Sequence, residues 1–275
     1  MISLLTDFAL VDEFVGVLHL VIERIAPGAP VVDLTHGLPR HDVRAGAVAL
    51  WRLAPWLAPG VVVAVVDPGV GTARRPVAIE TSWPAGRLVM IGPDNGLLFP
   101  AARAAPRLER AVVLDDAAYH LPRRAGSGAT FDGRDVFAPA GAHAWLGARV
   151  EDLGSSIDPA SLLGEPLREA RRFELDNMVG VEAEVLWVDH YGNAQLNLDE
   201  SDLDDFGEAV EVHVGDDRFP ATRSGSYAGL EGLGLVTDSY GKIALCLERS
   251  PAAALLGLEA GDGVRLVRSA RPPAS

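Results

Sequence analysis

The sequence predicts two folded parts, an α/β domain with a mostly parallel sheet covered by helices and, after it, a small all-β domain. Strand-like and helical patterns alternate through the first half, which is typical of a parallel sheet covered on both faces. The alternation ends after a helical pattern at residues 135–146. Six short strand-like runs with turns between them follow, and such runs fit a small sheet or barrel.

The α/β prediction rests on four apolar runs, each bounded by turn formers or polar residues. These runs are residues 2–5, 31–34, 61–66 and 88–91. Apolar residues recur at helical spacing over residues 12–25, until Pro27 ends the pattern. A second helix is expected to begin after Asp42, its N-cap, and to run to about Leu53.

The all-β prediction places strands at residues 181–188, 194–198, 209–214, 233–237, 243–247 and 264–267. Residues 154–165 contain turn formers without periodicity, so we expect a connection there. We therefore predict a boundary near residue 170, with domains at residues 1–168 and 172–275. Residues 269–275 are expected to be disordered.

The composition excludes several classes of protein. The 275 residues are 48% hydrophobic and supply a substantial core. The 38 acidic and 24 basic residues give a net charge of −14, which disfavours nucleic acid as a partner. Cys246, the single cysteine, lies in an apolar run and is expected to be buried. The start of the chain lacks signal-peptide features and no apolar stretch has the length of a membrane span, so we predict a cytoplasmic protein without a membrane partner.

Two acids follow predicted strands, and both are candidates for a site. Asp7 and Asp67 would lie at the carboxyl ends of parallel strands, where open α/β sheets bind ligands. Helix caps or turn residues are the alternative. Arg74 follows Asp67 by seven residues, so a tight loop can fold its guanidinium against that carboxylate. The alternative for this pair is a surface salt bridge of little energetic weight.

Other polar residues have two interpretations each. Asn95 before Gly96 predicts a hairpin turn. Asp132 stands at the front of the predicted helix, where an acid complements the helix dipole and needs no function. Asp189 begins a segment that is either a polar hairpin turn or a surface facing a ligand. The histidines have no spacing typical of metal ligands, so we predict no metal.

Six segments occur in a fixed order: LLTDF, VVDLTH, VVDPGVGTARR, PDNGLL, TFDGRDVFAPA and DHYGNAQLN. Together they indicate a protein family much more specifically than any one segment does. Together they resemble the S-adenosyl-L-methionine (SAM) hydroxide adenosyltransferase family, whose relatives include the bacterial fluorinase and chlorinase. The resemblance covers residues 2–266. It implies an α/β domain, a C-terminal β-barrel domain and a homotrimer with substrate between neighbouring subunits. It also implies that water attacks C5′ of the adenosyl group of SAM, the substrate, and releases methionine without a cofactor.

The resemblance assigns the catalytic residues. Asp67 and Arg74 match two members of the family's Asp-Arg-His set, and Asp132 stands where the family's TFHGRD has its histidine. An unperturbed aspartate is a weaker base than an imidazole. Our hypothesis is that Asp132 orients the water in place of the histidine and shares a proton with Asp67. His41, at a position that lines the family's pocket, is the alternative base.

The resemblance also implies the substrate contacts. Asp7 would bind the ribose hydroxyls, a role that suits a carboxylate accepting two hydrogen bonds. Tyr240 stands where the halogenases carry an arginine. The other matching residues are Asp12 and Asp189 near the methionine amine, Ser239 beside the methionine carboxylate, Asn193 at the adenine, Tyr191 as an aromatic wall, and Thr130 and Phe131 as pocket lining.

Three functions remain open from the sequence. The first is SAM hydrolysis to adenosine and methionine. The second is a binding protein that keeps the nucleoside pocket but has lost turnover with its histidine. The third is a halide-dependent adenosyltransferase, which Asp67 and Asp132 disfavour because two carboxylates repel an anion.

Overall fold

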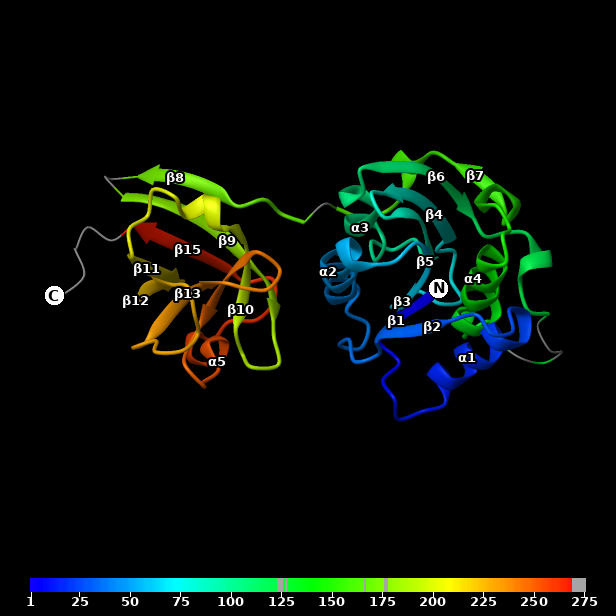
Figure 1. The fold of residues 1–275 in the computed structure, drawn as a ribbon, viewed down its shortest axis with the longest axis horizontal. Helices are drawn as coiled ribbons and strands as arrows, with labels where there is room; N and C mark the ends of the chain where they lie inside the picture. Colours follow the sequence, from blue (N-terminus) through cyan, green and yellow to red (C-terminus); the bar gives the residue numbers. More distant parts are fainter. Residues whose placement is uncertain (123–125, 127, 166, 176–177, 269–275) are drawn as a thin grey trace. The chain divides into compact units, whose positions relative to one another are not determined.

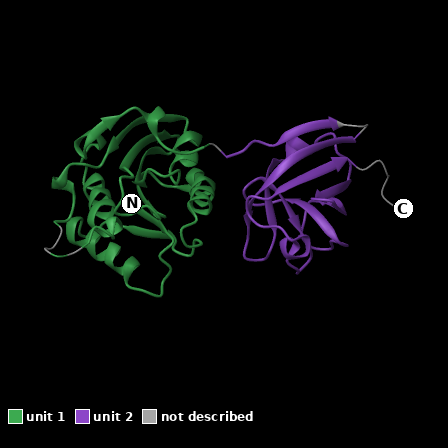
Figure 2. Cartoon of the chain, turned by 180° about the vertical axis from the view of Figure 1, so that it is seen from behind, with its two compact units in different colours: residues 1–166 green, residues 167–275 purple. Residues whose placement is uncertain are grey.

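A computed structural model describes residues 1–122, 126, 128–165, 167–175 and 178–268. The chain divides into two compact units, unit 1 at residues 1–166 and unit 2 at residues 167–275 (Figure 2). The tail predicted to be disordered, residues 269–275, lies outside the described residues.

The described part of unit 1 contains one seven-stranded sheet in the order β2-β1-β3-β5-β4-β6-β7. The strands are β1 (Ile2–Thr6), β2 (Val31–Thr35), β3 (Gly60–Val65), β4 (Pro76–Trp83), β5 (Gly86–Pro93), β6 (Arg107–Val113) and β7 (Ser155–Ile157). The four strands β2, β1, β3 and β5 pair in parallel, which confirms the predicted parallel sheet. Their apolar side chains are almost all buried in β1 and β3, as expected for strands covered on both faces.

Helices cover both faces of this sheet (Figure 1). They are α1 (Phe14–Ile25), α2 (Val43–Leu53), α3 (Phe99–Ala104) and α4 (Ala138–Trp145). The apolar faces of α1 and α4 pack in one cluster with β1, β3 and β5, whereas α2 and α3 pack together on the opposite face. Asp42 caps α2 as predicted, because its Oδ1 accepts a hydrogen bond from Ala45 N at 2.8 Å. Helix α1 begins at Phe14, two residues later than the periodicity suggested.

Strands β4, β6 and β7 extend the sheet with antiparallel pairings that the periodicity did not reveal. Strands β4 and β5 are separated by residues 84 and 85 alone, and so short a connection joins only antiparallel strands. The expected connection at residues 154–165 contains the short edge strand β7. The hairpin turn predicted at Asn95 is wrong, because β5 leads there into α3.

The helix predicted at residues 135–146 consists of a π-helical turn, Gly133–Phe137, followed by α4. Pro139 explains the change of geometry, because it has no N–H to offer the carbonyl of Asp135 four residues earlier. That carbonyl accepts a hydrogen bond from Leu121 N instead, at 2.9 Å. π-Helical turns occur frequently at functional sites.

The described strands of unit 2 form a closed barrel. The strands of the ring follow the order β10-β14-β13-β12-β11-β15-β9, and the pairing of β9 with β10 closes it. Strand β8 pairs with β9 outside the ring. The elements are β8 (Arg171–Leu175), β9 (Met178–Val188), β10 (Ala194–Asp199), β11 (Ala209–Val214), β12 (Asp217–Ser224), β13 (Leu233–Thr237), β14 (Lys242–Cys246), β15 (Gly263–Arg268) and the helix α5 (Ala252–Leu256). This confirms the predicted barrel; β8 and β12 were not predicted.

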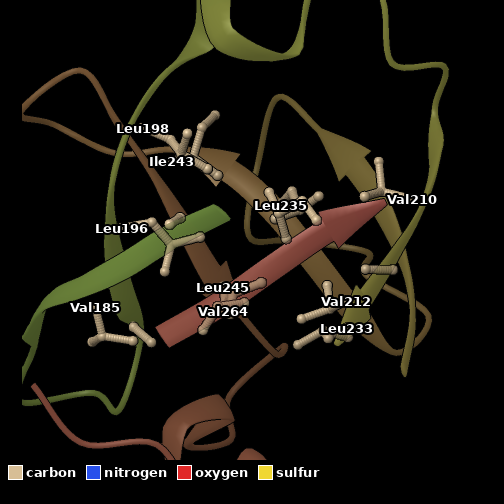
Figure 3. Packing of buried hydrophobic residues seen from close by; sticks show 14 of the residues in the cluster. Val185, Leu196, Leu198, Val210, Val212, Leu233, Leu235, Ile243, Leu245 and Val264 are labelled. Atoms are coloured by element: carbon tan, nitrogen blue, oxygen red, sulfur yellow. The ribbon is translucent and has the colours of Figure 1, made fainter. Parts of the chain in front are cut away.

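Side chains from every side of the ring fill the barrel (Figure 3). Leu196, Leu235, Leu245 and Val264 come from β10, β13, β14 and β15 and lie in one buried cluster. In β11 and β15, buried positions recur at every second residue along most of the strand, as expected when alternate side chains face the interior. Cys246 is fully buried, as predicted.

Candidate active site

A cavity of about 380 Å³ lies in unit 1, lined by residues from segments 7–14, 40–41, 65–70 and 130–133. The order of the sheet explains this grouping. Strands β1 and β3 are parallel neighbours, so Asp7 and Asp67, which follow them, reach the same edge. A larger hollow of about 690 Å³ lies on unit 2. The charge of its Glu182 is already balanced within the unit, because this carboxylate is paired with both Arg171 and Arg265.

Arg74 joins Asp67 and Asp132, the two acids expected to be catalytic. Its Nε donates to both carboxylate oxygens of Asp67, at 3.0 and 2.9 Å, and its Nη2 donates to Asp67 Oδ2 as well. The same Nη2 donates to Asp132 Oδ2 at 2.7 Å. The predicted return of Arg74 onto Asp67 is confirmed, and Asp132 joins the pair from a segment 58 residues further along the chain.

This cluster is buried. The side chains of Asp67, Arg74 and Asp132 are 5%, 10% and 11% exposed, so the alternative of a weak surface salt bridge does not hold. Burial by itself lowers the pKa of Arg74, but the hydrogen bonds and charges of Asp67 and then of Asp132 outweigh it and raise that pKa above its usual value. The guanidinium also lies 5.2 Å from the centre of the Phe137 ring. Arg74 therefore stays positively charged.

Local geometry brings Asp132 to this position. Asp132 precedes the π-helical turn, and this turn leads into α4, which packs against β1 and β3. A side chain at Gly133 would be crowded, because its Cβ would lie 3.1 Å from the Phe131 ring and 3.3 Å from the Phe8 ring and both rings would have to shift slightly. The small residue after Asp132 thus allows the segment to lie close to the aromatic side chains.

Three aromatic rings form an apolar wall of the cavity. Phe8, Phe14 and Phe131 pack edge to face, with ring centroids 5.1 to 5.9 Å apart. All three line the cavity with Thr130. The sequence predicted Phe131 and Thr130 here but missed Phe8 and Phe14; the available signal was that Phe8 follows Asp7 directly and Phe14 follows Asp12 by two residues.

Asp7 lies in the cavity and is tied to the segment after β2. Its Oδ2 accepts a hydrogen bond from His41 N at 2.8 Å, and His41 has a positive φ of 63°. Asp12 and His41 also line the cavity, and both residues are exposed. Arg40 lines it as well and was not predicted.

Two buried residues behind Asp7 support its position and were also missed. Thr6 Oγ1 lies 2.8 Å from His36 Nδ1 and accepts a hydrogen bond from Phe8 N at 3.1 Å. His36 O accepts a hydrogen bond from Ala9 N at 2.7 Å. The residues on both sides of Asp7 are therefore held by His36.

The other four predicted site residues belong to two turns of unit 2. Asp189 organises the β9–β10 turn: its Oδ1 accepts from Tyr191 N and Asn193 N at 2.9 Å, and its Oδ2 accepts from Asn193 Nδ2 at 2.8 Å. Gly192, at φ 82°, completes this polar hairpin turn. Tyr191 is 76% exposed. Ser239 is exposed in the β13–β14 turn.

The two turns are linked through Gln195, which the sequence analysis missed. Gln195 lies two residues after Asn193, and its Nε2 donates to Asp238 Oδ2, next to Ser239. Asp238 also accepts hydrogen bonds from Tyr240 N and Lys242 N, at 2.8 and 3.0 Å. Within the described residues, no group of His, Cys, Asp and Glu could hold a metal ion.

Two family models match the chain: the SAM hydroxide adenosyltransferase N-terminal domain over residues 2–154 and the corresponding C-terminal domain over residues 183–265. The chain belongs to the SAM hydroxide adenosyltransferase family. The division between the two compact units, after residue 166, lies between the two matched ranges.

Relatives in this family resemble the chain along nearly its whole length. The chain is 40% identical over 267 residues to the (R)-S-adenosyl-L-methionine hydrolase of Salinispora tropica, covering 96% of this chain and 97% of that protein. The (R)-S-adenosyl-L-methionine hydrolase of Thermus thermophilus is 40% identical over 269 residues, covering 96% and 98%. A solved structure of an uncharacterized conserved protein from Thermotoga maritima aligns with a TM-score of 0.83 at 29% identity, covering 97% and 99%. In the described part of the chain, no helix is long and apolar enough to span a membrane.

Proposed function

We propose that the protein hydrolyses SAM to adenosine and methionine by attack of water on C5′ of the adenosyl group. The buried bridge from Asp67 through Arg74 to Asp132, at the cavity of unit 1, is the observation that carries this proposal. Relatives with 40% identity over nearly the whole chain are named (R)-S-adenosyl-L-methionine hydrolase, which supports it.

The cluster suits the attacking water. A carboxylate of Asp67 or Asp132 orients a water molecule and accepts its proton, while Arg74 holds both carboxylates in place. The oxygen of the water forms a bond to C5′, the C5′–S bond breaks, and its electron pair remains on sulfur. Methionine leaves as a neutral thioether, so the leaving group needs no proton. Holding the water in line with the C5′–S bond contributes about 7 to 11 kcal/mol in well-oriented systems.

The surroundings suit the substrate. SAM carries a sulfonium, and four acids, Asp7, Asp12, Asp67 and Asp132, line the cavity and give it a negative charge that favours a cation. The wall of Phe8, Phe14 and Phe131 keeps bulk water away from the reacting carbon. The same negative charge disfavours a halide as the nucleophile.

The remaining roles are part of the proposal. Asp7 would bind the ribose hydroxyls, and Asp12 and Asp189 would lie near the methionine amine. Asn193, Tyr191 and Ser239 would contact the adenine, the nucleoside face and the methionine carboxylate. We also propose that the active form is a homotrimer with its sites between subunits, that it needs no cofactor, and that it works in the cytoplasm.

Isotope labelling tests the reaction. Purified protein is incubated with SAM in ¹⁸O-labelled water, with chloride present and absent, and the products are analysed by chromatography and mass spectrometry. We expect equal amounts of methionine and of adenosine labelled at its 5′ hydroxyl, independent of chloride. The Asp67→Asn variant should form far less product while still binding adenosine in calorimetry.

Two other results would replace the proposal. Chloride-dependent 5′-chloro-5′-deoxyadenosine would establish a halide-dependent adenosyltransferase. SAM binding without any product would establish a binding protein in which Asp132 does not replace the family's histidine.

A further inference from the structure

The loop at residues 66–75 carries both Asp67 and Arg74, and the order of the sheet explains what supports it. It connects β3 to β4, which are not neighbours, because β5 lies between them. Pro76 at the start of β4 pairs with Pro93 at the end of β5, so the loop crosses the carboxyl end of β5. Asp94 and Asn95 follow directly at that end.

Asn95 holds the beginning of the loop. Its Nδ2 donates to Val66 O at 2.9 Å, and Val66 is the residue before Asp67. Its Oδ1 accepts from Leu97 N at 3.2 Å, which fixes the orientation of the amide. The side chain that was first interpreted as part of a hairpin turn therefore binds a segment 29 residues away.

Asp94 holds the end of the loop. Its Oδ2 accepts from Arg75 Nε at 2.8 Å and its backbone N donates to Arg75 O at 2.9 Å. Arg75 follows Arg74, so the arginine that bridges the two acids is held through its neighbour. The Asp94 side chain is 2% exposed, and its Oδ1 accepts from Leu163 N at 2.8 Å.

The middle of the loop is held by its own turns. Thr72 Oγ1 donates to Gly69 O at 2.6 Å, and Val70 N donates to Asp67 O at 3.3 Å. Because these bonds lie within the loop, they fix its shape but not its position on the sheet. Its position depends on contacts with residues outside the loop: Arg74 bonds Asp132, Arg75 bonds Ser161, and Asp94 and Asn95 hold the two ends.

We propose that Asp94 and Asn95 are positioning residues, which hold Asp67 and Arg74 in the geometry that the reaction needs. This inference rests on the proposed function. Neither residue is among those that line the cavity, so neither is expected to contact substrate. Their loss should lower kcat and leave KM for SAM nearly unchanged.

The chain offers a matched control for Asn95. Asn197 in the barrel makes the same pair of bonds, because its Oδ1 accepts from Glu184 N at 2.7 Å and its Nδ2 donates to Arg168 O at 2.8 Å. Asn95→Ala and Asn197→Ala each remove one bond to a backbone N–H and one to a carbonyl. Asp94→Asn has its control in Asp115→Asn, because Asp115 Oδ1 accepts from Ser155 N at 2.8 Å.

Steady-state kinetics with SAM gives the first readout. We expect Asn95→Ala and Asp94→Asn to lower kcat by about 10- to 100-fold, the order of loss that a misplacement of roughly 1 Å causes. KM should change by less than about 2-fold, and both control variants should keep the wild-type kcat. An unchanged kcat in Asn95→Ala and Asp94→Asn, or an equal fall in the controls, would overturn the proposal.

A second readout does not depend on turnover. In protein labelled with ¹⁵N-arginine, the Nε–H of Arg74 is identified by its loss in Arg74→Lys, and its hydrogen exchange is measured by NMR. We expect exchange to become at least about 10-fold faster in Asn95→Ala and to stay unchanged in Asn197→Ala, because only the first loosens the bond to Asp67. Equal exchange rates in wild type and Asn95→Ala would overturn the positioning role. This readout holds even if the wild type does not hydrolyse SAM, and such inactivity would count against the proposed function alone.

Discussion

Asp132 changes the electrostatics of the cluster, because it stands where the resemblance places a histidine. A neutral imidazole at this position would leave Arg74 with one anionic partner, whereas Asp132 supplies a second, at 2.7 Å. The guanidinium therefore faces carboxylates from two segments and is held more firmly than by one. A second carboxylate also offers a second acceptor for the proton of the water.

Substitution of Asp132 tests this role. Asp132→Asn keeps the size of the side chain but removes the charge that holds Arg74 and that, in the proposed mechanism, receives the proton. We expect kcat to fall by roughly 100-fold or more, measured as adenosine release under saturating SAM. Asp132→His, which restores the residue of the family motif, should retain turnover. Wild-type kcat in Asp132→Asn would show that Asp132 has no part in the reaction.

Cys246 gives a pH dependence of stability. Burial first, and then the charge of Asp189, raise the pKa of its thiol from 9.0 to about 11. Between these values the unfolded chain loses the thiol proton while the folded chain keeps it, so this contribution to stability is present below pH 9 and lost as the pH rises towards 11. Calorimetry at about pH 8 and about pH 10.5 should show a smaller fall in Tm for Cys246→Ala than for wild type. Equal falls in Tm for Cys246→Ala and wild type would contradict this contribution of the thiol.

The turn between β9 and β10 shows how an element combines structure and proposed function. Its polar residues satisfy one another, since Asp189 accepts three hydrogen bonds from within the turn. Gly192 N also donates to Asp189 O, and Gly192 O accepts from Ala253 N at the start of α5. These bonds order the turn without a ligand, so under the proposed function it would lose little conformational entropy when SAM binds.

Gly192 should be the least replaceable residue of this turn. It has a φ of 82°, and a Cβ there would lie 2.4 Å from Pro251 Cβ and 2.6 Å from Pro251 Cα. Gly215 in the β11–β12 turn has a φ of 59° with no atom within 4 Å of its Cβ position, so Gly215→Ala measures the backbone strain alone. We expect Gly215→Ala to cost about 1 to 2 kcal/mol of unfolding free energy.

Gly192→Ala should cost roughly 1 to 3 kcal/mol more than Gly215→Ala, because a clash with Pro251 adds to the strain. Denaturant unfolding of the full chain measures both variants. Equal losses in the two variants would mean that the turn moves away from Pro251 at no cost.

At the scale of the whole molecule, the proposed substrate contacts divide between the two units. The unit 1 cavity holds Asp7, Asp67 and Asp132, whereas Asp189, Asn193 and Ser239 belong to turns of the barrel. A homotrimer with sites between subunits would combine unit 1 of one copy with unit 2 of another. Such a head-to-tail arrangement closes into a ring.

Mixed oligomers test this arrangement. Asp67→Asn damages the unit 1 half of a site and Asn193→Ala damages the unit 2 half, so each variant alone should be nearly inactive. Co-expressed in equal amounts, they should recover roughly a quarter of wild-type turnover, because each half of a site is intact with a probability of one half. Sedimentation should give about 87 kDa, three times 29.0 kDa. Recovery of no activity would mean that each site forms within one chain.

The sequence by itself determined the elements that follow from local periodicity and turn chemistry. These features depend on residues close together in the chain, so local sequence patterns predict them. They are the alternation of strands and helices, the cap at Asp42 and the pair Asp67 and Arg74. Tertiary structure decided the contacts between distant segments. Asp132 meets Arg74 across 58 residues and Asn95 meets Val66 across 29. These contacts depend on strand order, which places β5 beneath the loop at residues 66–75, and no local pattern encodes that order.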